Sequence, residues 1–411
     1  MTTSVVHAYD FIVSSKVGSF YEPITDSQGN QIGERFQNQI IDPNPTRGTS
    51  QGFAYNFAPN STPDPANRNW IFFLNDGQID IMDQAIVGAT GSYEKYTGGR
   101  VSQNIVSVDP DYVAEITLIE PESNPPVDKT QHVYEKFRIT AEGGFYLPFT
   151  SQDGKQFGEM FQNPIHFENT TAGGWGALMG SINLNQGFAF NYNTSSDPFI
   201  AAQRTLLLNR LFFLPGGELT VLDEAIVQGT GVYYKYTGGS FNETILSNDP
   251  KYIAEITLLE KEPYDSNLAN PPEVTLFLDA NSTEAIEEPI LNNMGGVIGK
   301  RIHVPINNED GTRIGSVLGY AYLFPNPAGQ TVNGNRRLFL KDGGLSVFND
   351  YIVHASGIYV GYAGGRLATS DNKITLIPPV TEGHSAGNRV VEKPGIMPVL
   401  LAAALASLIW L

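Results

Sequence analysis

Two histidines each stand two residues before a tyrosine, and this pattern is the first in the chain that could do chemistry. His7 precedes Tyr9, and His132 precedes Tyr134. Side chains two residues apart lie on one face of an extended strand, so each pair would share a surface. An imidazole beside a phenol can transfer a proton. The more ordinary alternative is a hydrogen-bonded strand residue at the rim of a sheet, and both interpretations stay open.

The sequence lacks the residues or motifs that several other kinds of catalytic and metal site require. The chain has no cysteine, which excludes disulfides, thiolate zinc sites and a cysteine nucleophile. It contains no Gly-x-Ser-x-Gly motif and no pair of histidines at metal-binding spacing. Asp76, Asp80 and Asp83 do not form an Asp-x-Asp-x-Asp-Gly calcium loop; we interpret them as solvated turn acids, with weak calcium binding as the alternative. We therefore expect no metal and no cofactor.

The charge balance argues against a nucleic-acid partner. The 411 residues include 25 basic and 43 acidic side chains, a net charge of −18. A surface this acidic repels DNA, RNA and anionic lipid. The many aromatic residues, 19 Tyr and 23 Phe, are typical of half-buried β-strands.

The elements that would position these residues occur three times. Similar blocks recur in the same order, so the chain is a triplicated domain. The repeated blocks are Gly77 to Gly99, Gly217 to Gly239 and Gly343 to Gly365, each preceded by a related stretch: Gln51 to Tyr55, Gln186 to Phe190 and Leu318 to Tyr322.

Each copy shows alternation with a period of two. Apolar runs such as 211–214 and 218–222 are separated by turn residues, which predicts strand, turn, strand. Each copy has room for about eight strands and has no helix to cover a sheet edge, which favours closure into a barrel. A two-sheet sandwich is the second choice. The predicted fold class is all-β, with three tandem eight-stranded antiparallel barrels and a hydrophobic C-terminal helix or tail.

Proline pairs mark the ends of the copies. Pro125-Pro126, Pro271-Pro272 and Pro378-Pro379 would make short, stiff spacers. We expect barrel domains at 1–122, 128–262 and 273–380, followed by a spacer and membrane-anchor signal at 381–411.

The repeated block resembles the allene oxide cyclase barrel-like family, which is related to the plant dirigent proteins. The resemblance rests on Gly-x-Ile-x-Ile and on Asp-x-Ala-Ile-Val-x-Gly-Thr-Gly-x-Tyr-x-x-Tyr-x-Gly-Gly, and more weakly on Gly33-Glu34 and Gly158-Glu159. It implies an eight-stranded antiparallel barrel that can enclose at most one small apolar ligand. We expect the turn glycines Gly91, Gly231 and Gly357 to adopt backbone angles closed to other residues.

The resemblance also implies candidate catalytic residues. In that family a carboxylate after a first-strand tyrosine steadies developing charge in an epoxide-derived oxylipin, and Asp10 and Glu135 match this position. The third copy has Thr275 in this region and offers no acid. The family's pocket cysteine has no counterpart here. Glu135 in the second copy is the best candidate, because it accompanies a complete Gly229-Thr230-Gly231 turn.

The C-terminal tail is a targeting signal. Ile396 to Leu411 is uncharged and apolar, and a polar spacer separates it from the small residues that begin at Ser385. Small residues, a spacer and a tail of this length are typical of a glycosylphosphatidylinositol (GPI) attachment signal, with Ser385 as the candidate site. A retained tail anchor and a buried core helix are the alternatives. The tail is short for a spanning helix, which takes about 20 apolar residues.

The N-terminal residues show no signal peptide. Either the N-terminus is incomplete, or the tail inserts after synthesis and the barrels face the cytosol. Candidate glycosylation sites stand at Asn60, Asn169, Asn193, Asn242 and Asn281.

We therefore expect a membrane protein, attached to the cell surface by a GPI anchor, that presents three barrels as a binding or structural module. A small apolar ligand is the expected partner besides the membrane, and the oligomeric state is left open. The alternative is an isomerase of the cyclase kind, or a dirigent-like enzyme, acting on a hydrophobic intermediate.

Overall fold

The computed structural model is all-β, as the sequence predicts, and contains three closed eight-stranded antiparallel barrels. It describes residues 8–15, 19–26, 28–41, 47–57, 66–108, 111–121, 132–151, 154–168, 175–176, 183–192, 197–200, 206–248, 251–261, 271–292, 294–326, 329–370 and 372–379.

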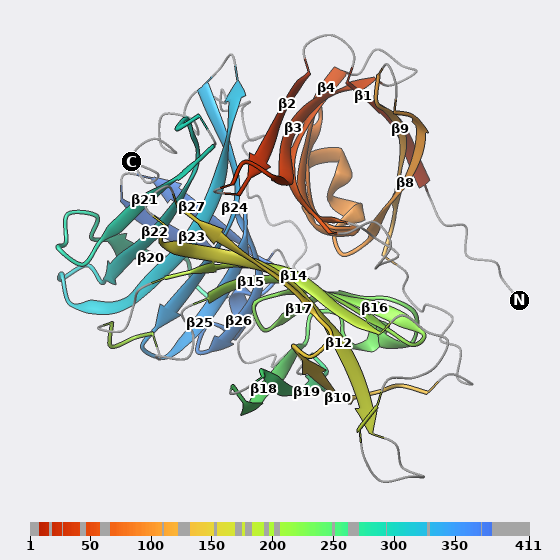
Figure 1. Cartoon of the computed structure of the whole chain (residues 1–411). Helices are drawn as coiled ribbons and strands as arrows, with labels where there is room; N and C mark the ends of the chain where they lie inside the picture. The colour runs from red at the N-terminus through yellow and green to blue at the C-terminus, as the bar shows by residue number, and fades with distance from the viewer. Residues whose placement is uncertain are drawn as a thin grey trace, which may run out of the picture. The chain divides into compact units, whose positions relative to one another are not determined.

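In the first barrel, β1 pairs with both β9 and β3, and this double pairing closes the ring. Figure 1 looks into this barrel, with β1, β4, β8 and β9 on its wall. β2 lies outside the ring and pairs with β3. The strands are β1 (Ala8–Ser14), β2 (Phe20–Thr25), β3 (Gln31–Ile41), β4 (Arg47–Asn56), β5 (Ala66–Leu74), β6 (Gly77–Met82), β7 (Ala85–Ala89), β8 (Arg100–Ser107) and β9 (Val113–Ile119).

The second barrel repeats this order, with β10 pairing with β19 and β12. β11 is its outer strand, and the two-residue β13 pairs with β12. The strands are β10 (Lys136–Thr140), β11 (Phe145–Thr150), β12 (Gln156–Glu168), β13 (Trp175–Gly176), β14 (Leu184–Asn191), β15 (Leu206–Leu214), β16 (Gly217–Leu222), β17 (Ala225–Gly229), β18 (Ser240–Ser247) and β19 (Ile253–Leu259).

The third barrel closes through β20, which pairs with β28 and β22, and β21 is its outer strand. Its strands are β20 (Val274–Leu278), β21 (Ile286–Leu291), β22 (Val297–Asn307), β23 (Arg313–Asn326), β24 (Gly329–Leu340), β25 (Gly343–Phe348), β26 (Tyr351–Gly357), β27 (Arg366–Ser370) and β28 (Lys373–Ile377).

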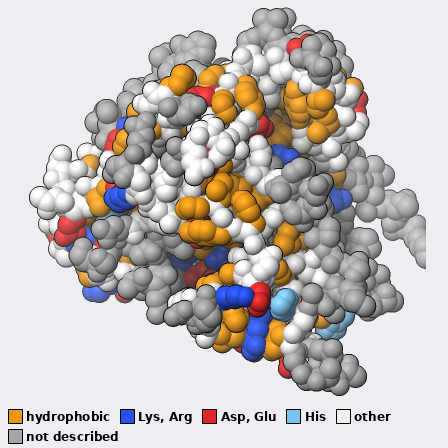
Figure 2. All heavy atoms as spheres, in the orientation of Figure 1, with side chains coloured by type: hydrophobic (Ala, Val, Ile, Leu, Met, Phe, Trp, Pro, Cys, Tyr) orange, Lys and Arg blue, Asp and Glu red, His pale blue; other side chains and the backbone are white. Residues whose placement is uncertain are grey.

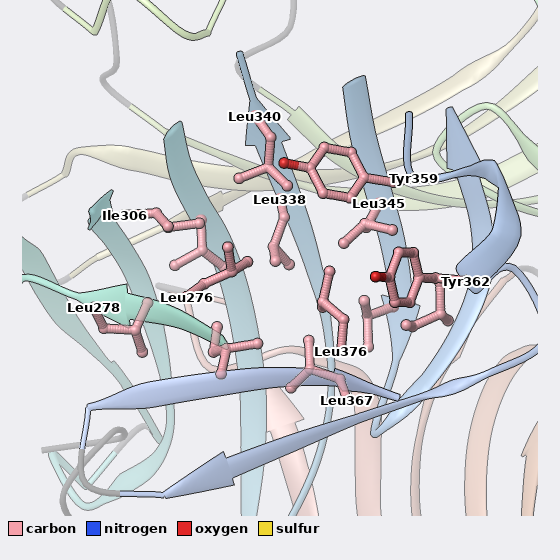
Figure 3. Packing of buried hydrophobic residues seen from close by; sticks show 14 of the residues in the cluster. Leu276, Leu278, Ile306, Leu338, Leu340, Leu345, Tyr359, Tyr362, Leu367 and Leu376 are labelled. Carbon is pink, nitrogen blue, oxygen red and sulfur yellow. The ribbon is translucent and has the colours of Figure 1, made fainter. Parts of the chain in front are cut away.

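Alternate side chains of each strand fill the barrel interiors. In the third barrel the core includes Leu338 and Leu345, which lie opposite each other on the paired strands β24 and β25, together with Tyr359 and Tyr362 (Figure 3). The first and second barrels have cores of the same plan around Phe72 and Phe212. Removing this apolar surface from water is the main force that holds each barrel together.

One end of each barrel is closed by the segment after the turn glycine. In the second barrel the short helix η2 (Gly231–Tyr236) buries Tyr233 and Tyr236 in the core. The first barrel has η1 (Gly91–Tyr96) in the same place, visible inside the ring in Figure 1, and the third has η4 (Val360–Tyr362). The opposite end of each barrel, where β8, β18 or β27 ends, is here called the mouth.

The turn glycines have positive φ: +62° at Gly91, +56° at Gly231 and +65° at Gly357. Only glycine adopts this region of backbone angles without a steric cost.

Two of the acids that we expected to be solvated turn residues are buried instead. These are Asp80 and Asp83. Asp83 Oδ1 accepts a hydrogen bond from the Arg68 backbone N–H, and Gln78 Nε2 donates to Asp80 Oδ2. The described residues contain no group of acids and histidines that could hold a metal.

The chain forms two compact units. The first comprises residues 1–191 and 208–262, which hold the first two barrels, and the second comprises 192–207 and 263–411. Within the first unit, the barrels meet through β4, β5 and β14. Phe53 and Tyr55 contact Phe188 with ring centroids 6.0 and 4.6 Å apart. Gln186 Nε2 donates to Asn67 Oδ1 at 3.0 Å.

In the second unit, a segment that follows β14 packs on the third barrel. The side chain of Asp197 is 1% exposed there. Its Oδ2 lies 2.6 Å from Ser316 Oγ and 2.7 Å from both His303 Nε2 and Arg313 NH2. Tyr192 donates its hydroxyl hydrogen to Gly319 O at 2.7 Å. We call residues 192–200 the clasp; within it the structure describes 192 and 197–200.

Among the described residues, none of the helices has the length and apolar character that crossing a bilayer requires. The expected anchor signal, including Ser385 and Ile396 to Leu411, lies outside the described residues.

Candidate functional site

The mouth of the second barrel buries a charged cluster. Arg210 on β15 is 5% exposed and lies over the ring of Phe241, a core residue. Its NH2 donates to Glu243 Oε2 at 2.8 Å and its NH1 to Oε1 at 3.3 Å. Tyr252 donates its hydroxyl hydrogen to the same carboxylate. An ion pair inside a barrel costs desolvation that an apolar pair would avoid, so its presence calls for a functional explanation.

The charges of this cluster stabilise one another. Burial would raise the pKa of Glu243, but the charge and hydrogen bonds of Arg210 lower it below its usual value. Burial would lower the pKa of Arg210, and Glu243 raises it. Burial and the neighbouring Glu243 raise the pKa of Tyr252. The site therefore holds a carboxylate, a guanidinium and a neutral phenol.

One donor of the cluster lacks an acceptor. Arg210 Nε is buried and has no hydrogen-bond partner among the residues that the structure describes. A guanidinium has five N–H donors, and Glu243 takes up only its outer nitrogens. Leaving a buried donor unpaired costs about 1–3 kcal/mol. An acceptor oxygen supplied by a ligand would recover this free energy.

A second carboxyl lies near Arg210 with the opposite tendency. Burial raises the pKa of Glu159 on β12 above its usual value, although Tyr146 and Gln156 donate hydrogen bonds to it and the charge of Arg210 lowers it. Two carboxyls with pKa values shifted in opposite directions are a common arrangement in acid–base sites.

Exposed apolar residues border this mouth. Ile245 and Leu246, at the end of β18, are 47% and 46% exposed. A β-bulge between Ile245 and Ser247 interrupts their pairing with β19. Bulges re-aim side chains and are frequent beside binding sites. Tyr146 on the outer strand β11, whose hydroxyl donates to Glu159, is also exposed, so exposed apolar side chains border the polar cluster.

The strand register identifies the equivalent positions in the other barrels. Arg210 lies opposite Val221, as Trp70 lies opposite Ile81 and Arg336 opposite Val347. Glu243 lies opposite Ile256, as Gln103 lies opposite Ile116 and Thr369 opposite Ile374. The three mouths thus carry Arg–Glu, Trp–Gln and Arg–Thr at one pair of positions. Their chemistry differs although the barrels share one plan.

The structure places Asp10 and Glu135 outside this cluster. Asp10 is exposed on β1 opposite Thr117. Glu135 is exposed and precedes β10, and its carboxylate lies 3.1 Å from Lys235 Nζ. The hydrogen bond from Lys235 lowers the pKa of Glu135. Thr257 of β19 occupies the position that Thr117 has in β9. Because Lys136 lies opposite Thr257, Lys136 and not Glu135 is the structural equivalent of Asp10.

The remaining sequence-based candidates lie apart from the mouth cluster. His132 is exposed and packs edge-on against Tyr134, with ring centroids 4.5 Å apart. His7 lies outside the described residues. Asn242 and Asn281 are exposed, as glycosylation requires. Asn60, Asn169 and Asn193 lie outside the described residues.

Sequence reasoning missed Arg210, Glu243 and Tyr252 as a group. The signal was a difference between copies: β15 carries Arg210 where β5 carries Trp70, and an asparagine precedes and an apolar run follows each of them. A charged residue in a core position of only some copies could have marked the site. Glu159 did appear in the Gly158-Glu159 match, where it supported only the resemblance.

Comparison with known proteins adds no family. No protein-family model matches the chain, and no curated protein matches it. Among solved structures, a ligand-bound DNA polymerase sliding clamp from Pseudomonas aeruginosa is 9% identical, with 90% of this chain and 92% of that chain covered and a TM-score of 0.10. A sliding clamp from the same organism bound to griselimycin is 7% identical, covers 90% and 91%, and has a TM-score of 0.08. TM-scores this low carry no argument about fold or function.

Proposed function

We propose that this chain is a membrane-anchored protein that presents three barrels as a binding and structural module, and that its second barrel binds a small apolar ligand. The observation that carries the proposal is the unpaired Nε–H of Arg210, buried beneath the apolar rim of Ile245 and Leu246. A ligand with an apolar body and one acceptor oxygen would fill both needs.

The charges of the mouth favour a neutral ligand. Arg210 is already neutralised by Glu243, and Glu159 would repel an anion whenever it is ionised. A carbonyl, hydroxyl or ether oxygen can accept from Nε without adding charge to a buried site. The ligand class is therefore a small lipid-like molecule with an uncharged oxygen.

The binding proposal is tested by mass spectrometry of lipids that co-purify with the full chain. The double variant Arg210→Met/Glu243→Leu removes the ion pair without leaving a buried charge alone, and such replacements are often tolerated. Arg138→Met is the control, because Arg138 lies on the outer side of β10, where it pairs with Glu255. We expect one neutral lipid class in the wild type and the control, and its loss in the double variant. Equal recovery from all three proteins would refute the proposal.

The membrane half of the proposal rests on the C-terminal sequence. As a helix, Ile396 to Leu411 would be about 24 Å long, short of a hydrocarbon core near 30 Å. This length holds a precursor for processing but strains a permanent span. A phospholipase that cuts phosphatidylinositol anchors should release the protein from intact cells. A mature protein that retains Leu411 and resists the phospholipase would favour the tail-anchored alternative with cytosolic barrels.

A cyclase-like or dirigent-like enzyme is the rival function, and the opposite pKa shifts of Glu159 and Glu243 favour it. A protonated carboxyl could donate to an epoxide oxygen while the carboxylate steadies positive charge on carbon. Turnover of an epoxy fatty acid by the full chain, lost in Glu159→Gln and kept in Glu135→Gln, would support this function. No turnover by the wild type would leave binding as the function.

A further inference from the structure

The first barrel buries a donor at the position that Arg210 occupies in the second. Trp70 on β5 is 6% exposed and belongs to the first core. Its ring packs edge-on against Phe36 and Phe72, with centroids 5.7 and 5.6 Å apart. Trp70 Nε1 is buried and has no hydrogen-bond partner in the described part of the chain. An indole N–H can only donate, so it needs an acceptor from elsewhere.

Apolar residues border this mouth as well. Ile105 and Val106 at the end of β8 are 55% and 57% exposed. A bulge between Ile105 and Ser107 matches the one in β18. Figure 2 shows hydrophobic side chains at the surface over the first barrel, at the upper right. The third barrel differs, because β27 and β28 pair without a bulge up to Ser370 and Lys373.

The polar residues of the first mouth are balanced in charge. Gln103 Nε2 donates to the hydroxyl oxygen of Tyr112. Burial raises the pKa of Tyr112, while Arg68 lowers it and Glu34 raises it, which places one cation and one anion near this phenol. The buried donor itself is neutral. A neutral buried donor with one cation and one anion near it favours a neutral ligand over an ionic one.

We propose that the first barrel holds a second ligand site, which binds a small neutral amphiphile such as a ketone, ester or alcohol. The oxygen of the ligand accepts a hydrogen bond from Trp70 Nε1, and Ile105 and Val106 cover its apolar chain. Like the proposed function, this inference treats an unpaired buried donor as a ligand contact. The site lies in a different barrel, and the resonance of Trp70 reports on that barrel alone.

The test follows the indole N–H resonances of the full chain labelled with ¹⁵N-tryptophan. The chain has three tryptophans, and Trp70→Phe identifies the resonance of Trp70. We expect 2-octanone to shift this resonance downfield in a saturable way, and to leave those of Trp175 and Trp410 in place. A Trp70 resonance that does not move would overturn the proposal. An equal shift with heptane, which has no oxygen, would overturn the hydrogen bond.

A matched pair of variants tests the rim. Val106→Asp should weaken 2-octanone binding about tenfold, which corresponds to the loss of one apolar contact. Val297→Asp is the control, because Val297 is 52% exposed but lies on β22 of the third barrel. Its dissociation constant should match the wild type. Equal affinities for both variants would show that the rim does not contact the ligand. Failure here leaves the lipid test of the second barrel unaffected.

Discussion

At the scale of single residues, Gly231 shows how closely the backbone passes itself where the helical turn begins. A Cβ added there would lie 2.0 Å from Gly216 O, and φ is +56°. Both the clash and the backbone angle exclude a larger residue. Gly91 and Gly357 show the same approach, at 1.8 Å from Asp76 O and 1.9 Å from Asp342 O.

Gly231→Val should therefore destabilise the second barrel by about 3 kcal/mol or more. Gly154→Ala is the control, because Gly154 has φ of +81° but no atom within 4 Å of an added Cβ. It should cost only the backbone strain, about 1–2 kcal/mol. Urea unfolding measures both, and equal costs would contradict the role given to the close approach.

The shifted pKa of Glu159 predicts a pH-dependent stability. A carboxyl whose folded pKa is raised contributes stability that is present below its unfolded pKa, about 4.3, and is lost as pH rises through the folded pKa. Glu159→Gln keeps a neutral group at all pH values. The variant should thus melt higher than the wild type at pH 7, and the difference should shrink toward pH 4. A difference that does not change with pH would mean that Glu159 is not desolvated.

At the scale of elements, the clasp is a segment of the second repeat that belongs to the second unit. Asp197 Oδ2 contacts the His303 imidazole, the Arg313 guanidinium and the Ser316 hydroxyl, and Oδ1 accepts a hydrogen bond from the Phe199 backbone N–H. Burial would raise the pKa of Asp197, but Ser316, the Phe199 N–H, His303 and Arg313 lower it. Phe199 lies under the guanidinium of Arg313.

Asp197→Ala should destabilise the second unit by about 3–5 kcal/mol at pH 7, because Arg313 and His303 lose their shared partner. Asp310→Ala, at an exposed turn of the same barrel, should change little. The pKa of Asp197 is lowered, so its contribution is present above the unfolded pKa, near 3.9, and falls away as pH drops through the folded value. The difference in melting temperature between the variant and the wild type should be largest at pH 7 and should shrink as the pH is lowered below 3.9. The opposite order would be inconsistent with a charged Asp197.

At the scale of the whole molecule, the first two barrels behave as one unit because equivalent faces meet. Asn209 Nδ2 lies 3.3 Å from Asn69 Oδ1, and the register shows that these residues are equivalent. Tyr55 stacks on Phe149 at 4.9 Å and contacts Phe188. Contiguous aromatic surface of this kind usually marks an interface, and here the other barrel covers it.

Phe188→Ala should cost about 3–5 kcal/mol and weaken both barrels of the first unit together. Phe339→Ala in the third barrel, where Phe339 is 8% exposed, serves as the control and should leave the first unit unchanged. Hydrogen exchange followed by mass spectrometry would measure each barrel. Faster exchange in the second barrel alone would argue against coupling between the two barrels.

Much of the fold could be predicted from the sequence because it depends on local sequence patterns. Period-two runs such as 218–222 became strands, and the repeated glycines mark the turns that close each barrel. The buried site could not be predicted, because Arg210 on β15, Glu243 on β18 and Tyr252 just before β19 are far apart in the chain and no spacing links them. The one-residue offset between Asp10 and Glu135 was also hidden, since only the pairing with Thr117 and Thr257 reveals it.

The sequence by itself determined that this protein is all-β, that it contains three copies of one barrel, and that each copy turns at a glycine. These properties depend on side-chain alternation and on the backbone freedom of single residues, which act over a few positions. Only the tertiary structure decided which residues share a barrel mouth and which donors are left without an acceptor. Closure of the ring brings together residues far apart in the chain, and the desolvation that shifts the pKa of Glu159 and isolates Arg210 Nε exists only inside the packed barrel.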